Sequence, residues 1–329
     1  MGDLPEPALG DDEVVLNVHA AALNHLDIWV RKGRPGATPK FPHIIGSDAS
    51  GVVAAAGSRA QGIKEGDEVI INPGLGCGQC EYCRRGQQSA CVSFGIMGMS
   101  RPGTFARKVA VPAGNIYPKP AHLSFEEAAA LPLSYVTAWR MLFTRAGLKP
   151  GDTVLIHGIG GGVAIAALQF AKAAHAEVIV TSSSEEKLRR AKQLGADYAV
   201  NYRSVKDVAH AVREFNGGKG VDICVNSVGA AALPIDIAAV RHDGHIVLCG
   251  VTTGAEATVD LRRIYWNQLN IHGSTMGSDE DFRQMLKAVV AARIQPVIDS
   301  VYPLESAQEA MARMEAGEQF GKIVLKISN

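Results

Sequence analysis

Four of the six cysteines lie close together, in the segment GLGCGQCEYCRRGQQSAC. Two, two and seven residues separate them in turn, and glycines stand beside them. Thiolates at such spacings suit a tetrahedral zinc ion, and a closed site of four sulfur ligands leaves no position for water or substrate. We therefore expect one structural zinc, held by Cys77, Cys80, Cys83 and Cys91.

Two other uses of these thiols stay open. One is an iron–sulfur cluster, although the last spacing is longer than in the common ferredoxin run and no proline follows Cys91. The other is a pair of disulfides, which the cytoplasm disfavours. Cys224 and Cys249 fall in apolar runs typical of buried strands, so we expect them to pack in the core.

A glycine cluster is the second pattern that could carry chemistry. An apolar run at 153–156 precedes it, a helical segment at 163–174 follows it, and a β-branched run comes at 178–181. This order predicts a dinucleotide-binding unit, because glycines let backbone approach a pyrophosphate and free N–H groups at the helix start face the anion. The alternative is a plain βαβ crossover with a permissive turn. The expected pyrophosphate residues are Gly158, Gly160, Gly161 and Gly162, and Val163 is also expected to bind the cofactor.

The end of the second strand of this unit bears on the choice of nicotinamide cofactor. An acidic residue there binds the ribose 2′-hydroxyl of NAD. This chain instead has Ser182 and Ser183, which can donate to a 2′-phosphate. Lys187, Arg190 and Arg203 lie where a cation could reach that phosphate, although each also fits an ordinary solvated face. We expect NADPH in preference to NADH.

Composition limits the partners. A chain of 329 residues is longer than one that packs around a single hydrophobic core, so two domains are expected. Lys and Arg together equal Asp and Glu at 33 each, and no long basic run occurs, which disfavours nucleic acid and anionic membranes. No apolar run reaches the roughly 18 residues of a membrane span, and the acidic start is no signal peptide. We expect a cytoplasmic protein that acts on a small molecule.

Two kinds of secondary structure must position these residues. Short β runs broken by Gly and Pro fill the first third and predict a small barrel-like β domain, whose strand at 13–22 leads into a loop. The middle of the chain alternates strands with helices, as in a doubly wound sheet. An apolar face predicts a helix from Ser278, and a capping pattern predicts another that opens at Ser306. A final strand at 323–327 is expected to return to the β domain.

Together these features resemble the medium-chain dehydrogenase/reductase family, which includes zinc alcohol dehydrogenases and zinc-free quinone and enoyl reductases. The resemblance covers nearly the whole chain. Besides the cysteine loop and the glycine cluster, it rests on Gly46-x-Asp48-x-x-Gly51-x-Val53, Gly66–Val69, Leu133–Trp139 and Gly321–Leu325. It implies an α/β fold with a Rossmann doubly wound parallel sheet and a GroES-like β-barrel domain. The Rossmann domain would span 135–274, and the GroES-like catalytic domain 1–134 and 275–329.

Members of the family usually begin with a β-hairpin ahead of a proline-rich turn. This sequence starts almost at that turn, Leu4–Pro7. We therefore expect either a β domain without this edge hairpin or a sequence that begins after it.

The resemblance also shows which metal ligands are replaced. Alcohol dehydrogenases of this family hold a catalytic zinc with Cys, His and Cys, and the matching positions here are Asn24, Ser47 and Leu133. An apolar side chain and two weak neutral donors do not hold zinc against water. The chain is therefore similar to the zinc-free quinone oxidoreductase branch. A rebuilt metal site that uses Asp48 and His43 is the alternative.

Site roles follow from the same resemblance. Asn24 is the expected hydrogen-bond donor to the substrate oxygen, unless it only ties a loop to backbone. Asp27 would orient Asn24 or its loop, and Ser47 is either a proton donor or a buried structural serine. Thr137 would touch the nicotinamide amide, and Tyr202 would pack near the adenosine phosphate. The cofactor groove would also be lined by Asn226, Gly250 and Val251.

We expect hydride transfer from NADPH to a quinone or an activated C=C bond without a catalytic metal. A conjugated carbonyl needs only orientation and hydrogen bonds to its developing enolate oxygen. Two other functions stay open: an alcohol dehydrogenase with a non-standard metal site, and a non-catalytic NADPH-binding redox sensor. By analogy with the family, pairing across an exposed sheet edge near 269–272 would form a homodimer, or a tetramer.

Overall fold

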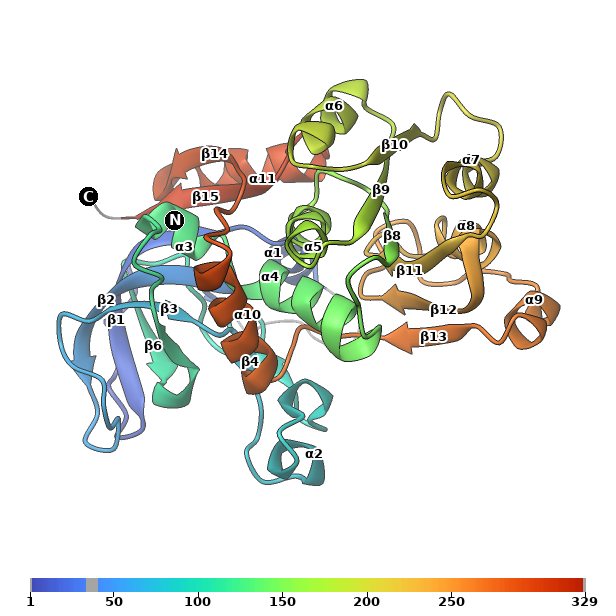
Figure 1. Ribbon diagram of the computed structural model, residues 1–329. Helices are drawn as coiled ribbons and strands as arrows, with labels where there is room; N and C mark the ends of the chain where they lie inside the picture. Colours follow the sequence, from blue (N-terminus) through green and yellow to red (C-terminus); the bar gives the residue numbers. More distant parts are fainter. Residues whose placement is uncertain (1, 34–40, 328–329) are drawn as a thin grey trace. The chain divides into compact units, whose positions relative to one another are not determined.

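The computed structural model describes residues 2–33 and 41–327 (Figure 1). The chain divides by its contacts into two compact units: Met1–Val136 with Gly277–Asn329, called unit 1, and Thr137–Met276, called unit 2. Unit 1 is thus built from both ends of the chain, and unit 2 from one continuous segment. No helix in the described residues is long and apolar enough to cross a membrane.

The described part of unit 1 contains a seven-stranded sheet organised around strand β1 (Glu13–Ala22), which confirms the strand expected at 13–22. Its neighbours are β2 along one edge, and β6 and β15 along successive parts of the other. Alternate side chains of a strand face the core, so β1 buries Val14, Leu16 and Val18. The other strands of the sheet are β2 (Asp48–Ala56), β3 (Glu68–Ile71), β6 (Lys108–Pro112), β7 (Ile116–Pro118), β14 (Ile298–Pro303) and β15 (Lys322–Lys326). The short strands β4 (Gly74–Leu75) and β5 (Gly95–Ile96) form a separate two-stranded sheet.

Helix α1 (His25–Lys32) replaces the loop expected after the first strand. Asn24 is its N-cap residue, and the Asp27 carboxylate accepts the backbone N–H of Asn24 at 2.7 Å. The helix buries Leu26, Ile28 and Val30. An Asn-x-x-Asp pair before an amphipathic segment is the signal for a helix start that the sequence interpretation missed.

The two helices predicted near the end of the chain begin where they were expected. Helix α10 (Asp279–Ala291) begins as predicted, since Ser278 Oγ accepts the Asp281 N–H at 3.1 Å. Helix α11 (Ala307–Glu315) also begins where expected, with Ser306 as its N-cap residue, but Ser306 ends a short 3₁₀ turn and forms no side-chain cap. Also present are α2 (Glu81–Arg84) and α3 (Phe125–Ala129), while α4 (Pro132–Trp139) spans the residue at which the two units divide.

Unit 2, all of whose residues are described, contains a six-stranded parallel sheet in the order β10-β9-β8-β11-β12-β13. This is the strand order of the Rossmann fold, so the predicted doubly wound sheet is confirmed. All four residues of β8 are buried, as expected of a central parallel strand. The strands are β8 (Thr153–Ile156), β9 (Glu177–Ser182), β10 (Tyr198–Asn201), β11 (Val221–Asn226), β12 (Val240–Leu248) and β13 (Asn270–Gly273). The helices are α5 (Gly162–Ala173), α6 (Glu185–Gln193), α7 (Val208–Phe215), α8 (Leu233–Ala239) and α9 (Leu261–Trp266).

Candidate functional site

Three polar side chains meet in the interior of unit 1. The Lys322 ammonium donates to Asn24 Oδ1 at 2.7 Å, to the Leu23 carbonyl oxygen at 2.8 Å and to Asp48 Oδ2 at 3.0 Å. Asn24 in turn donates from Nδ2 to Asp48 Oδ2 at 2.9 Å. Asp48 is fully buried, and Lys322 and Asn24 are 3% and 7% exposed. The two charges are thus paired and hydrogen-bonded, which offsets the cost of removing them from water.

Three neighbouring strands position this network. Asn24 follows β1, Asp48 opens β2 and Lys322 opens β15, and β1 lies between the other two. The second oxygen of the Asp48 carboxylate accepts the backbone N–H of Leu133 at 2.9 Å. Thr104 Oγ1 donates to the backbone carbonyl of Asp48 at 2.9 Å. The Asp48 side chain is therefore fixed at both of its oxygens.

Asp27 lies beside this network and is 2% exposed. Burial raises the pKa of Asp27 to about 7, and the nearby Asp48 adds to the rise. Backbone N–H groups of Asn24 and Gly46 oppose it by donating to the carboxylate. Gly46 has φ +100°, and a Cβ there would lie 2.3 Å from the Phe105 ring, so a side chain does not fit at this position.

Ser47 and His43 are bonded to other groups. Ser47 Oγ donates to the Met97 carbonyl at 2.9 Å, and His43 Nε2 lies 2.9 Å from the Gly98 carbonyl oxygen. Both oxygens of Asp48 are also occupied. Within residues 2–33 and 41–327, the cysteine cluster is the one group of three or more potential His, Cys, Asp or Glu ligands. These residues therefore do not fit a rebuilt catalytic metal site.

Lys322 is the functional candidate that the sequence interpretation missed. It belongs to the motif 321–325, but no role was assigned to its side chain. A lysine at the start of an apolar strand is the available signal, because a buried ammonium needs a counter-charge. Its partners Asn24 and Asp48 lie 298 and 274 residues away, so no local pattern identifies them.

The four cysteine thiols approach one another in unit 1, with ligand atoms within 4.8 Å. A tetrahedral zinc with Zn–S bonds of about 2.3 Å would space the sulfurs by roughly 3.8 Å, so the cluster is compatible with a structural zinc. Backbone N–H groups of Cys77 and Ser93 lie 3.3 and 3.4 Å from Cys91 Sγ. The N–H of Cys83 lowers the pKa of Cys80 to about 6. Burial raises the pKa of Cys83 to about 12, so a thiolate there requires a cation beside it.

In unit 2 the predicted glycine turn joins β8 to α5. Gly158 and Gly160 have φ of +65° and +130°, a backbone conformation that favours glycine. A Cβ on Gly158 would also lie 2.8 Å from the Val228 side chain. Gly161 is the N-cap residue of α5, which begins at Gly162. The first N–H groups of this twelve-residue helix therefore adjoin the turn, an arrangement suited to an anion.

Most other predicted cofactor residues stand at the carboxyl ends of strands in unit 2. They are Ser182 and Ser183 at the end of β9, Tyr202 and Arg203 after β10, Asn226 at the end of β11, and Gly250 and Val251 after β12. Because these strands are parallel, their ends share one edge of the sheet, where α/β proteins bind ligands. Lys187 lies in α6, and Thr137 is buried in α4.

A buried network ties three of these strand ends together, and the sequence interpretation did not find it. Asp236 of α8 accepts from Asn226 Nδ2 at 2.8 Å and lies 2.8 Å from His157 Nε2. His157 Nδ1 lies 3.1 Å from Thr181 Oγ1. Since a carboxylate only accepts, His157 Nε2 carries a proton. Asn226 Oδ1 accepts the Gly229 N–H at 2.7 Å, so this side chain shapes the loop after β11.

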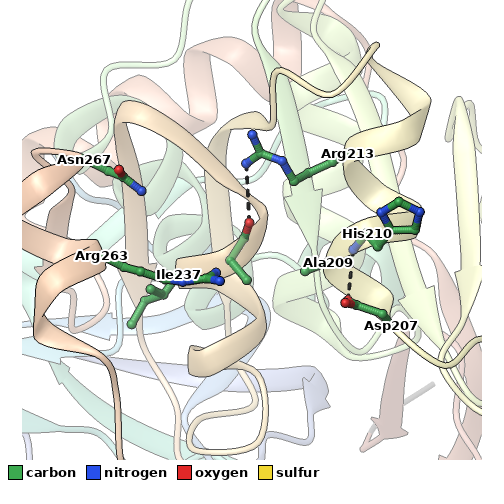
Figure 2. Close-up of a pocket in the computed structure, with 8 residues that line it drawn as sticks. Asp207, Ala209, His210, Arg213, Ile237, Arg263 and Asn267 are labelled. Atoms are coloured by element: carbon green, nitrogen blue, oxygen red, sulfur yellow. Dashed lines mark hydrogen bonds between the residues drawn. The ribbon is translucent and has the colours of Figure 1, made fainter.

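A surface pocket of about 380 Å³ lies among α7, α8 and α9 of unit 2 (Figure 2). Arg213 donates to the Ala238 carbonyl at 3.4 Å, and the Asp207 carboxylate accepts the His210 N–H at 2.9 Å. None of the site residues expected from the sequence lines it. We therefore assign the pocket no part in cofactor binding.

Known proteins match this chain over both units. The family described as "Alcohol dehydrogenase GroES-like domain" matches residues 10–121, and "Zinc-binding dehydrogenase" matches 162–291. A zinc-type alcohol dehydrogenase-like protein of Schizosaccharomyces pombe is 35% identical, over 97% of this chain and 92% of its own length. Quinone oxidoreductase of Homo sapiens is 29% identical, over 98% and 92%. A crystal structure of an NAD-dependent alcohol dehydrogenase is 46% identical with a TM-score of 0.95, over 99% of this chain and 95% of its own. On this evidence the chain belongs to the medium-chain dehydrogenase/reductase family of oxidoreductases.

Proposed function

We propose that the protein is an NADPH-dependent reductase that transfers a hydride, without a catalytic metal, to a quinone or to a C=C bond conjugated with a carbonyl. One observation carries this proposal. The Lys322 ammonium lies within hydrogen-bonding distance of Asn24 and Asp48, in the part of unit 1 where family metal ligands are replaced. A catalytic zinc beside it would add a second cation, while the charge of Asp48 is already compensated.

Substrates of this class need no metal, because their own carbonyl group takes up the charge that develops. Bound NADPH supplies the hydride. A preorganised donor at the carbonyl oxygen stabilises the growing negative charge, and a proton from water completes the reduction. Asn24 gives one amide N–H to Asp48 and has a second. We assign this second N–H to the substrate oxygen.

The preference for NADPH rests on the end of β9. Ser182 and Ser183 stand there in place of a carboxylate that would repel a 2′-phosphate. The acidic residues that follow are engaged, since Glu185 accepts from Asn201 and Glu186 pairs with Arg189. An NAD-dependent enzyme is among the similar structures, so NADH is the competing cofactor.

Self-association through β13 is part of the proposal. β13 is an edge strand of the fully described sheet in unit 2, and its Ile271 is 41% exposed. Tyr265 and Trp266 of the preceding helix α9 are 66% and 74% exposed. A second copy paired along this edge would cover both the open strand and apolar surface.

The function is tested by incubating the protein and NADPH with quinones, enones and enoyl thioesters, and by metal analysis of the same sample. We expect NADPH oxidation with at least one substrate class and about one zinc per chain. About two zinc ions per chain with NAD-dependent oxidation of alcohols would establish an alcohol dehydrogenase instead. NADPH binding without turnover of any substrate would favour a redox sensor.

A further inference from the structure

The two ends of the Asn24 side-chain amide contact groups of opposite charge. Its oxygen accepts from Lys322 Nζ at 2.7 Å, and its nitrogen donates to Asp48 Oδ2 at 2.9 Å. An ammonium can only donate and a carboxylate can only accept. The orientation of this amide is therefore determined by the chemistry of its partners, whereas amides among neutral partners are often ambiguous.

Lys322 has no N–H left for a substrate. Its three ammonium protons are matched by three acceptors: the Leu23 carbonyl oxygen, Asn24 Oδ1 and Asp48 Oδ2. The side chain is also only 4% exposed. Lys322 therefore influences the hydrogen bonds that a substrate receives only through its own partners, Asn24 and Asp48.

The contacts also specify which of the two amide protons of Asn24 remains for a substrate. Lys322 Nζ, Asp48 Oδ2 and the amide of Asn24 form a closed ring of contacts of 2.7, 2.9 and 3.0 Å. Such a ring uses the amide N–H on the same side as the amide oxygen, so the second N–H points away from both charges. If the Asn24 amide were rotated by half a turn, its oxygen would take the position of its nitrogen. A substrate would then meet this oxygen in place of the second N–H, and the oxygen would repel an enolate oxygen.

We propose that Lys322 is a positioning residue that makes Asn24 a hydrogen-bond donor, rather than an acceptor, towards the substrate oxygen. This inference rests on the proposed function, and it names the interaction that takes the place of a catalytic zinc. Asp48 alone does not determine the orientation of the Asn24 amide. A buried carboxylate that loses its ammonium partner tends to take up a proton, and a carboxylic acid can donate to the amide oxygen or accept from the amide nitrogen.

The test compares Lys322→Met and Lys322→Arg with wild type. We expect Lys322→Met to lower kcat for an enone on the order of 100-fold, as the loss of an oxyanion donor does, with the Kd for NADPH unchanged. Lys322→Arg, which keeps the charge and the donors, should recover about tenfold or more of that loss. Lys326→Met is the matched control, because Lys326 lies on the same strand and is exposed.

A spectroscopic readout separates positioning from a merely structural role. The carbonyl stretch of a bound, unreactive enone should move to lower frequency in wild type, and the shift should disappear in Lys322→Met. If Lys322→Met does not fold, the double variant Lys322→Met/Asp48→Asn removes both charges together and should show the same losses. A folded variant of either kind that keeps kcat within about threefold of wild type, and keeps the carbonyl shift, overturns the inference. The proposed function fails separately, if wild-type protein reduces neither enones nor quinones or if Asn24→Leu retains full kcat.

Discussion

Oδ1 of Asp236 lies 2.8 Å from Nε2 of His157, the residue directly before the glycine turn, and both side chains are buried. Replacing His157 by Asn would leave a buried carboxylate with Asn226 as its remaining side-chain partner. We expect a loss of about 2–4 kcal/mol in the free energy of unfolding and weaker NADPH binding. Urea denaturation and fluorescence titration measure these changes. His242→Asn, at an exposed position, is the control.

Asp27 should make stability depend on pH. Burial raises its pKa from 3.8 to about 7 in the folded state. Below about pH 4, Asp27 is protonated in both the folded and the unfolded protein. Between about pH 4 and 7 only the unfolded protein releases this proton, so the free energy of unfolding falls as the pH rises. The loss reaches about 4 kcal/mol by pH 7 and then stays constant. Asp27→Asn cannot ionise, so the difference in unfolding free energy between wild type and variant should change over this window. A constant difference would contradict the shift.

The cysteine loop should account for the zinc. We expect Cys91→Ser to lower the zinc content from about one to near zero per chain and to expose residues 77–91 to proteolysis. Elemental analysis and limited proteolysis check both outcomes. Cys249→Ser, outside the cluster, should keep its zinc. Full zinc retention in Cys91→Ser would rule out the four-thiolate site.

A carboxylate at the end of β9 should reverse the cofactor preference. We expect Ser183→Asp to weaken NADPH binding by about tenfold or more, because the new charge repels the 2′-phosphate, and to improve NADH binding. Gln193→Glu adds a negative charge at the other end of α6 and should change neither Kd. Wild-type protein that binds NADH about tenfold more tightly than NADPH would show that the reading of Ser182 and Ser183 is wrong.

The structural features that were best predicted from the sequence are those that depend on continuous runs of residues. Strand β8 is a short, wholly buried apolar run followed by glycines with positive φ, and each of these features is local. Helix α1 was not predicted, because the Gly- and Pro-rich residues that follow it suggested a loop. Its capping pair, Asn24 and Asp27, is nevertheless a local pattern in the sequence. The contacts of Lys322 could not be predicted, because they depend on how β15 pairs with β1 and how β1 pairs with β2. Ser47 and Asp48 are adjacent in sequence, yet one bonds the Met97 carbonyl and the other an ammonium.

The division of unit 1 between the two ends of the chain has a consequence for biosynthesis. Unit 2 is complete once residue 276 has left the ribosome, and it can fold as its own segment comes out. Unit 1 must wait, because its strands β14 and β15 follow unit 2 in the chain. Until Lys322 is added, Asp48 and Asn24 belong to a nascent chain that lacks the ammonium they bond in the finished protein. The order of synthesis therefore delays the proposed substrate-binding network until unit 2, the proposed cofactor-binding unit, has had time to form.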